Sequence, residues 1–234
     1  ALEVLKGRHE RAVALCRKAE TSCGELRGAE DLYWGGKGLT ADDMATLGTL
    51  LRWMPRLEIL WLVQSSLGDR GMQALCEGMG CGAAPSLRYL ELEDNQFGPA
   101  GAEALATALG RGAMPKLEEL GLGCNPIGKQ GVAALAAPLR MLPALKNLSL
   151  AYCKIGDEGV ATLVAGLGKD DFKALKELWL AGNNINDAGM VKLVAAIDAG
   201  GLPKLIDHHF FISGNPTTAA AVVGVSLALD KRSQ

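Results

Sequence analysis

The stretch LEELGLGCNPI, residues 117–127, decides the fold of this chain. Its apolar side chains are Leu117, Leu120, Leu122 and Ile127, and Asn125 is the polar residue among them. The spacing of two between Leu120 and Leu122 points both side chains to one face of a short strand. The Asn125 amide can bond backbone groups in the turn that leaves the strand. The stretch therefore predicts a strand with a buried leucine face, followed by a tight turn.

The same pattern recurs along the chain at nearly constant intervals. Units start at Leu57, Leu87, Leu117, Leu145, Leu175 and Leu205, in steps of 30, 30, 28, 30 and 30 residues, and a further unit starts at Ala29. Ser65 and Cys153 take the asparagine position in two units, and stacked repeats are expected to align the asparagine amides into a ladder. A single unit cannot bury its own apolar face, so seven stacked units predict one continuous core.

The second half of each unit changes to helical spacing. Apolar positions recur at i, i+4 and i+8, which predicts one buried helix stripe per unit. The sets are Gly71/Leu75/Met79, Gly101/Leu105/Leu109, Gly131/Leu135/Leu139, Gly159/Leu163/Leu167 and Gly189/Leu193/Ile197. The glycine is expected to let each helix start approach the neighbouring repeat. Prolines at 55, 85, 115, 143 and 203 stand two residues before a strand leucine and predict the return loops.

The terminal units depart from the pattern. In the first unit Ala29 replaces a leucine, Trp34 fills a core position and Asp43 stands where later units have glycine. In the last unit His208 falls where leucine is expected and Ser213 where asparagine is expected. Since terminal repeats often cap the core, we expect an N-terminal capping helix over residues 1–25 and repeats over 26–215. A C-terminal capping helix and polar tail are expected over 216–234. The N-terminal helix could alternatively be a docking element.

These repeats resemble the long leucine-rich repeats of the ribonuclease-inhibitor type. The resemblance rests on units of 28–30 residues that combine the leucine–asparagine strand motif with a full helix, over residues 26–216. It implies an α/β horseshoe of about seven repeats, with a parallel inner sheet and outer helices, and protein–protein binding as its usual role. The same type includes the repeat domains of NOD-like receptors and of Ran GTPase-activating proteins. A fold of this kind does not name a partner.

Composition excludes few classes of function. The formal net charge is −2, with a small basic excess in residues 1–28, so nothing points to nucleic acid. The most apolar run, residues 219–229, is too short to cross a bilayer. The six cysteines show no CxxC pair, which favours free thiols in the cytoplasm or another reducing intracellular compartment. The absence of an initial Met leaves open that the chain is a fragment of a longer protein.

The repeat predicts which side chains face solvent on the inner sheet. That face is expected to hold all three tyrosines, two tryptophans, seven acidic residues and no lysine or arginine. The candidate binding residues on it are Tyr33, Trp61, Tyr89, Glu91, Glu93, Glu119, Tyr152, Glu177, Trp179, His209 and Phe211. Exposed aromatic residues are enriched at binding hot spots, and acidic neighbours favour a partner with lysine or arginine.

The leading hypothesis is an interaction scaffold that binds a basic, partly apolar segment of another protein on this face. An inner face of assorted side chains without a binding role is the plain alternative. A GTPase-activating module of the Ran type and a sensor repeat of a NOD-like receptor are the other two alternatives.

No catalytic or cofactor motif is expected. No Ser/His/Asp or Cys/His constellation can be assembled from the spacing. Asp207, His208 and His209 could ligate a metal, but no second cluster of ligands appears, so no metal is expected. Gly121 and Gly123 lie inside a strand and are interpreted as structural variation.

Overall fold

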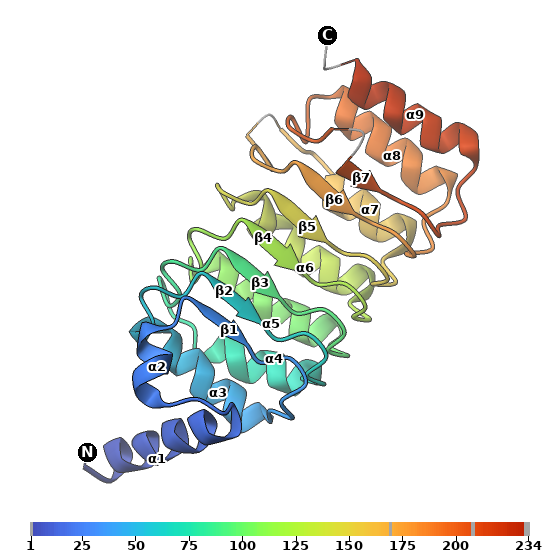
Figure 1. Cartoon of the computed structure of the whole chain (residues 1–234). Coiled ribbons are helices and arrows are strands. Elements are labelled where there is room, and N and C mark those ends of the chain that lie inside the picture. The colour runs from blue at the N-terminus through green and yellow to red at the C-terminus, as the bar shows by residue number, and fades with distance from the viewer. Residues whose placement is uncertain (1, 169, 207–208, 232–234) are drawn as a thin grey trace.

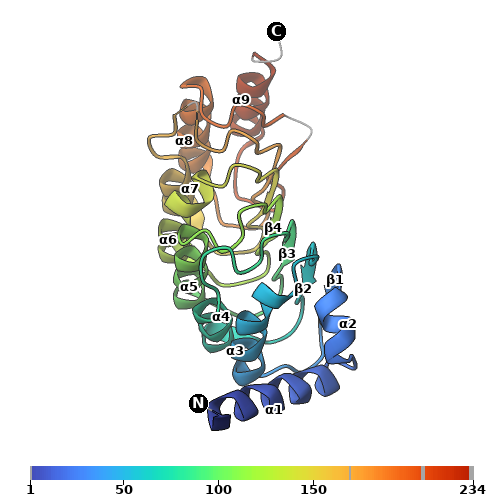
Figure 2. The same ribbon diagram turned by 90° about the vertical axis from the view of Figure 1, so that its left-hand side faces the viewer.

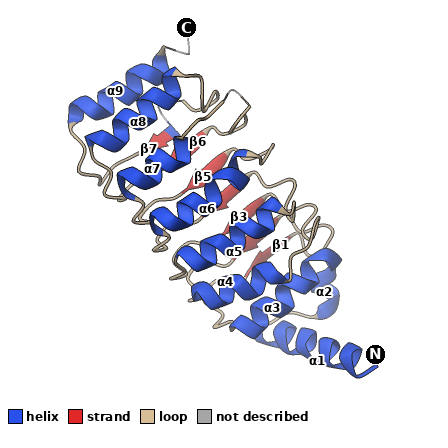
Figure 3. Ribbon diagram, turned by 180° about the vertical axis from the view of Figure 1, so that it is seen from behind, coloured by secondary structure: helices blue, strands red, loops and turns tan. Residues whose placement is uncertain are grey.

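The computed structural model shows an elongated stack of strand–helix units (Figure 1). It describes residues 2–168, 170–206 and 209–231. Seven parallel strands form one sheet in chain order, β1 to β7. The helices of the repeats cover one side of this sheet, as the views from the side and from behind show (Figures 2 and 3). We call the other side of the sheet the inner face.

The elements alternate along the chain. The strands are β1 (Asp31–Tyr33), β2 (Ile59–Trp61), β3 (Tyr89–Glu91), β4 (Glu119–Gly121), β5 (Asn147–Ser149), β6 (Glu177–Trp179) and β7 (Phe210–Phe211). The helices are α1 (Leu2–Lys18), α2 (Cys23–Gly28), α3 (Ala41–Leu50), α4 (Gly68–Glu77), α5 (Pro99–Gly110), α6 (Gly128–Arg140), α7 (Gly156–Val164), α8 (Asp187–Asp198) and α9 (Ala219–Asp230), with a 3₁₀ turn at Leu51–Trp53.

The width of each layer explains why the stack is an arc. Neighbouring strands are about 4.8 Å apart, whereas packed helices need about 10 Å, so the strands take the inner side. The core lies between the two layers, where the strand leucines and the helix stripes are buried. Leu105, Leu135 and Leu163 are at most 2% exposed, which confirms the predicted helix stripe.

The predicted asparagine ladder is present. Asn95, Asn125 and Asn183 are fully buried, and each side-chain carbonyl accepts a hydrogen bond from the backbone of the preceding repeat. Their amide groups donate to strand carbonyls, as Asn95 does to Leu62 and Leu92. The ladder therefore supplies hydrogen bonds to buried backbone groups in the turns, where no strand partner exists.

A second connection between repeats was not predicted. The carboxylate of Asp69, at the start of α4, accepts hydrogen bonds of 2.7 Å from the backbone of Gly98 and Gly101. Asp157 does the same for Asn186 and Gly189 at the start of α8. Since the first turn of a helix leaves N–H groups unpaired, each aspartate stabilises the helix of the following repeat.

The helix glycines are needed chiefly for contacts inside their own repeat. A Cβ on Gly131 would lie 2.3 Å from Ile127 and 2.9 Å from Ala102 of the preceding repeat. Gly71 and Gly159 likewise face the side chain four residues before them, whereas a Cβ on Gly189 would lie 2.5 Å from Asp157 of the preceding repeat and 2.7 Å from Ile185. The apolar residue that ends the turn of the same unit thus fills the space beside the helix start. Close approach of the neighbouring repeat is only part of the reason why glycine stands at this position.

Two helices lie at the N-terminus, where one capping helix is predicted. Helix α1 packs against α3 and is followed by α2, which starts with Ser22 and Glu25 in a reciprocal capping box. Asp43 takes the glycine position of the first unit because it caps α3, accepting from the Thr40 backbone at 2.7 Å and pairing with Lys18 at 2.7 Å. Trp34 is buried, as its core position predicts. No helix in the described part of the chain is long and apolar enough to cross a membrane.

The register predicted for the last unit is wrong by two residues. Phe210, not His208, pairs with the core residue Leu178 of β6. Asn215, not Ser213, completes the ladder, because its side-chain carbonyl accepts from the backbone of Asn183 and Ile185 at 2.8 and 3.0 Å. The last step between units is therefore 32 residues. Asp207, His208 and the end of the polar tail, residues 232–234, lie outside the described residues.

Candidate functional site

The strand register sorts the inner-face residues into rows that run across the sheet. The middle row takes one residue from each strand: Tyr33, Trp61, Glu91, Gly121, Ser149, Trp179 and Phe211. A neighbouring row contains Tyr89, Glu119, Asn147 and Glu177. The middle row has aromatic residues at both ends and a carboxyl group and small residues between them.

A cavity of about 230 Å³ lies over the centre of this face. Six of the predicted binding residues line it: Trp61, Glu91, Glu93, Glu119, Glu177 and Trp179. Gly121, Asn147 and Ser149 line it as well, although the sequence did not single them out as binding residues. Their place in the rows between the acidic and aromatic positions was the signal that could have identified them.

Gly121 forms the floor of this cavity, and Gly123 follows it in the same segment. A Cβ on Gly121 would lie 1.8 Å from Oε2 of Glu91, and a Cβ on Gly123 would lie 2.7 Å from Oε1 of Glu93. The two carboxyl groups of β3 and its following loop thus lean over the β4 segment. Two carboxyl groups occupy the space beside these glycines, and the interpretation of the glycines as structural variation stays a prediction.

Neutral groups position the carboxyl groups. The Ser149 hydroxyl donates to Glu93 at 3.0 Å, and the Asn147 amide donates to Glu119 at 3.0 Å. Glu91 is hydrogen-bonded to Glu119. Burial, followed by the negative charges of Glu119 and Glu93, raises the pKa of Glu91 to about 8. The raised pKa favours the protonated form of Glu91 near neutral pH.

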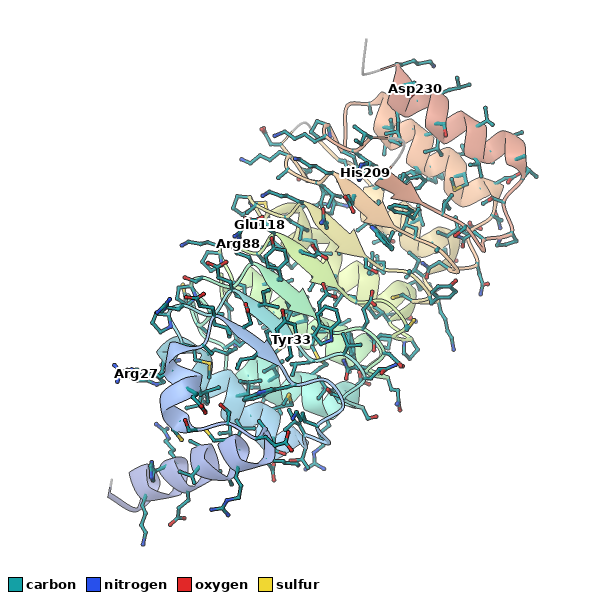
Figure 4. All side chains as sticks on the ribbon, in the orientation of Figure 1. Arg27, Tyr33, Arg88, Glu118, His209 and Asp230 are labelled. Carbon is teal, nitrogen blue, oxygen red and sulfur yellow. The ribbon has the colours of Figure 1, made fainter. Side chains whose placement is uncertain are left out.

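The basic side chains nearest Glu91, Glu93 and Glu119 form ion pairs with other carboxylates. Arg88 and Lys146 lie in the row just before the strands, and both pair with Glu118, at 3.0 and 2.6 Å. Arg88 also reaches Glu58 at 3.3 Å. Figure 4 labels Arg88 and Glu118 close together beside β3 and β4. Among the described residues, no ion pair reaches Glu91, Glu93 or Glu119.

Two aromatic pairs flank the acidic cavity. The rings of Tyr33 and Trp61 have centroids 6.2 Å apart, and those of Trp179 and Phe211 are 4.3 Å apart. Both tryptophans are 41% exposed, so each offers an open ring surface beside the carboxyl groups. Both pairs are tilted, with interplanar angles of 43° and 41°, so each pair is in direct ring contact.

The remaining predicted residues lie around this centre. His209 contacts Glu177 through Nδ1 at 2.7 Å, at the β7 end of the face (Figure 4). Tyr89 lies outside the cavity lining, with the Arg88 guanidinium 5.4 Å from its ring centroid. Tyr152 is exposed in the loop after β5, and its ring occupies the space beside Gly182. Tyr89 and Tyr152 are therefore peripheral to the cavity that the other predicted residues share.

The acidic cluster is not arranged as a metal centre. Within the described ranges, no group of three or more His, Cys, Asp or Glu side chains is placed to hold a metal ion. Of the Asp207, His208 and His209 triplet, only His209 belongs to those ranges.

Comparison with known proteins bears on the repeats. The Leucine Rich repeat family model matches residues 83–106, 113–136, 143–164 and 174–194. No curated protein matched the chain. Among solved structures, the chain is similar to "Leiomodin-1 Actin-Binding Site 2 (ABS2)" at 14% identity and a TM-score of 0.40, covering 57% of this chain and 88% of that one. That weak likeness carries no conclusion about this protein.

The matched repeats and the sheet agree on the architecture. The chain is an α/β leucine-rich-repeat solenoid, with seven parallel strands and about seven repeats. The family description names the repeat and no subtype, so the ribonuclease-inhibitor type stays a prediction.

Proposed function

We propose that this solenoid is a scaffold that binds another protein rather than an enzyme, and that its inner face holds a basic, partly apolar segment of that partner. The observation that carries the proposal is the cluster of Glu91, Glu93 and Glu119, which forms no ion pair with any residue that the structure describes and lies between two exposed tryptophans.

Electrostatics favours a basic partner. Burial first, and then the negative charges of Glu119 and Glu93, raise the pKa of Glu91, so the half-buried hollow disfavours further negative charge. A lysine or arginine from a partner would offset those negative charges and pair with carboxylates that water screens only in part. Arg88 and Lys146 do not serve this purpose, because both pair with Glu118.

The aromatic pairs favour an apolar contribution from the partner. Tryptophan rings that remain 41% exposed leave apolar area in water, and such area on a concave face is typical of binding sites. Tryptophan and tyrosine are also the residues that most often dominate binding energy at interfaces. A partner that combines apolar side chains with a cation therefore satisfies both parts of the face.

The test uses labelled nine-residue peptides that contain leucine with arginine or lysine, and matched peptides with glutamate in place of each basic residue. We expect the basic peptides to bind at least tenfold more tightly in fluorescence anisotropy. The triple variant Glu91→Gln, Glu93→Gln, Glu119→Gln should lose that preference, whereas Glu103→Gln, on exposed α5, should keep it. Equal binding of basic and acidic peptides, or an unaffected triple variant, would refute the proposal.

We further propose that the protein works in a reducing intracellular compartment. All six cysteines are free thiols in the structure, including Cys16 and Cys23, whose sulfurs lie 3.2 Å apart. Thiol titration of the protein purified from its native source without added reductant tests this. Six reactive thiols after denaturation are expected, and a count of four or fewer would contradict it.

A further inference from the structure

We infer that the occupant of the inner face is an extended segment that lies across the strands, with two apolar residues six positions apart and an arginine or lysine between them. This inference rests on the proposed function and adds to it the direction, conformation and spacing of the partner.

The direction follows from the middle row. Its aromatic members, Trp61 and Trp179, lie on β2 and β6, and the strands between them contribute Glu91, Gly121 and Ser149. The two tryptophans and the acidic and small residues between them thus follow one another across five strands of the sheet. A segment that contacts both tryptophans and the carboxyl groups must run perpendicular to the strands.

The spacing follows from sheet geometry. Four strand steps separate Trp61 from Trp179, which at about 4.8 Å per step is roughly 19 Å. An extended peptide advances about 3.3 Å per residue, so two side chains that reach the two tryptophans are about six residues apart. An α-helix advances about 1.5 Å per residue and would need roughly 13 or 14 residues for the same distance.

The depth of the centre explains the cation between the two apolar residues. Gly121 carries no side chain, Ser149 carries a short one, and the carboxyl groups of Glu91 and Glu93 extend over the glycine floor. A long basic side chain can enter the cavity of about 230 Å³ while the peptide backbone stays at the level of the tryptophan rings. An arginine can donate to several carboxyl oxygens at once, so we expect it to bind more tightly than lysine.

Ionisation at the site accompanies this binding. A cation beside Glu91 opposes the burial and the like charges that hold its proton, so binding should release a proton near neutral pH. The charged groups that face Glu91 are Glu93 from its own segment and Glu119 from β4. Calorimetry in two buffers of different ionisation enthalpy would detect the released proton.

The experiment is selection of a random eighteen-residue peptide display library on the whole chain, followed by anisotropy with the selected peptides. We expect enriched peptides with arginine or lysine between two apolar residues six positions apart. Trp61→Ala and Trp179→Ala should each weaken them at least tenfold. Gly121→Ala should do the same by displacing the Glu91 carboxyl group, whereas Gly110→Ala, where a Cβ meets no atom within 4 Å, is the control.

The outcomes separate this inference from the proposed function. Basic peptides with no preferred apolar spacing, or with the roughly 13- or 14-residue spacing that a helix needs, would overturn the extended segment and leave the scaffold proposal standing. Enriched peptides that are not basic, or no enrichment at all, would overturn both. Circular dichroism and the urea midpoint of each variant establish that a loss of binding is not a loss of folding.

Discussion

Replacing Asn183 with leucine should lower the free energy of unfolding by more than the loss of a single hydrogen bond would. Leucine has nearly the same shape as asparagine but makes no hydrogen bonds. The Asn183 carbonyl accepts from the Cys153 backbone at 2.8 Å and from Ile155 at 3.4 Å. Its amide group donates to the Leu150 carbonyl at 2.7 Å and also to Leu180 and Ala181.

The magnitude depends on which groups are left unpaired. Leu180 keeps a hydrogen bond from Asn215, and Ala181 keeps one from the Tyr152 backbone. The Cys153 N–H and the Leu150 carbonyl lose their short contacts, and the Ile155 N–H loses its longer one of 3.4 Å, inside a core where Asn183 is 0% exposed. A buried backbone group without a partner costs about 1–3 kcal/mol, so the two short contacts alone should account for a loss of roughly 4 kcal/mol in the free energy of unfolding.

Urea denaturation followed by circular dichroism measures this change. Asn147→Leu is the matched control, because it loses one hydrogen bond to Glu119 on the open inner face and should change the free energy of unfolding by less than about 1 kcal/mol. Hydrogen exchange at the Cys153 amide should accelerate in Asn183→Leu alone. If Asn183→Leu costs no more than Asn147→Leu, the ladder does not stabilise the stack in the way described.

Three further predictions concern single residues. Cys153→Asn should raise the free energy of unfolding by about 1 kcal/mol, because the Asn125 backbone N–H now donates to sulfur and would gain an oxygen acceptor; an unchanged urea midpoint would contradict this. Glu91 has a pKa of about 8 in the folded state against 4.5 ordinarily, so its stabilising contribution is complete below pH 4.5 and is lost as the pH rises through 8. Urea midpoints between pH 5 and 8 should therefore fall less steeply in Glu91→Gln, and parallel profiles would count against the raised pKa. Gly131→Ala should cost at least about 2 kcal/mol, because its Cβ would lie 2.3 Å from Ile127, whereas Gly110→Ala should be neutral or slightly stabilising in the same urea titration.

Much of the inner face could be predicted because strand side chains alternate. A period of two assigns every second residue to the solvent side, and this placed Trp61, Glu91, Glu119 and Trp179 correctly. It could not show that Glu91 and Glu93 bend over the neighbouring strand, because that depends on which residue stands beside them in the sheet. The same limit applies to the carboxyl group of Glu91 that lies beside Gly121.

The last unit shows where counting along the chain fails. The first six strands are spaced by 28 or 30 residues. Continuing that spacing assigned the core position of the last strand, where a leucine is expected, to His208. The structure inserts two residues, so Phe210 fills the core position and Asn215 reaches the ladder. The two hydrogen bonds that Asn215 accepts from backbone N–H groups stabilise the fold by more than two extra loop residues cost. The free energy of closing a loop rises only slowly with its length.

The architecture was present in the sequence, since a repeat needs only local spacing to define its strand, turn and helix, and each repeat packs only on its neighbours. Leu120, Leu122 and Asn125 predict their own places without reference to distant residues. The binding cavity is different in kind. It needs Trp61 and Trp179, which are 118 residues apart, on the same row, and it needs the carboxyl groups between them to lie over glycines of another strand. Only the register of the folded sheet brings these groups together. Repulsion between carboxyl groups and the space above a glycine both depend on which side chains are adjacent in the fold, and the sequence order does not give that.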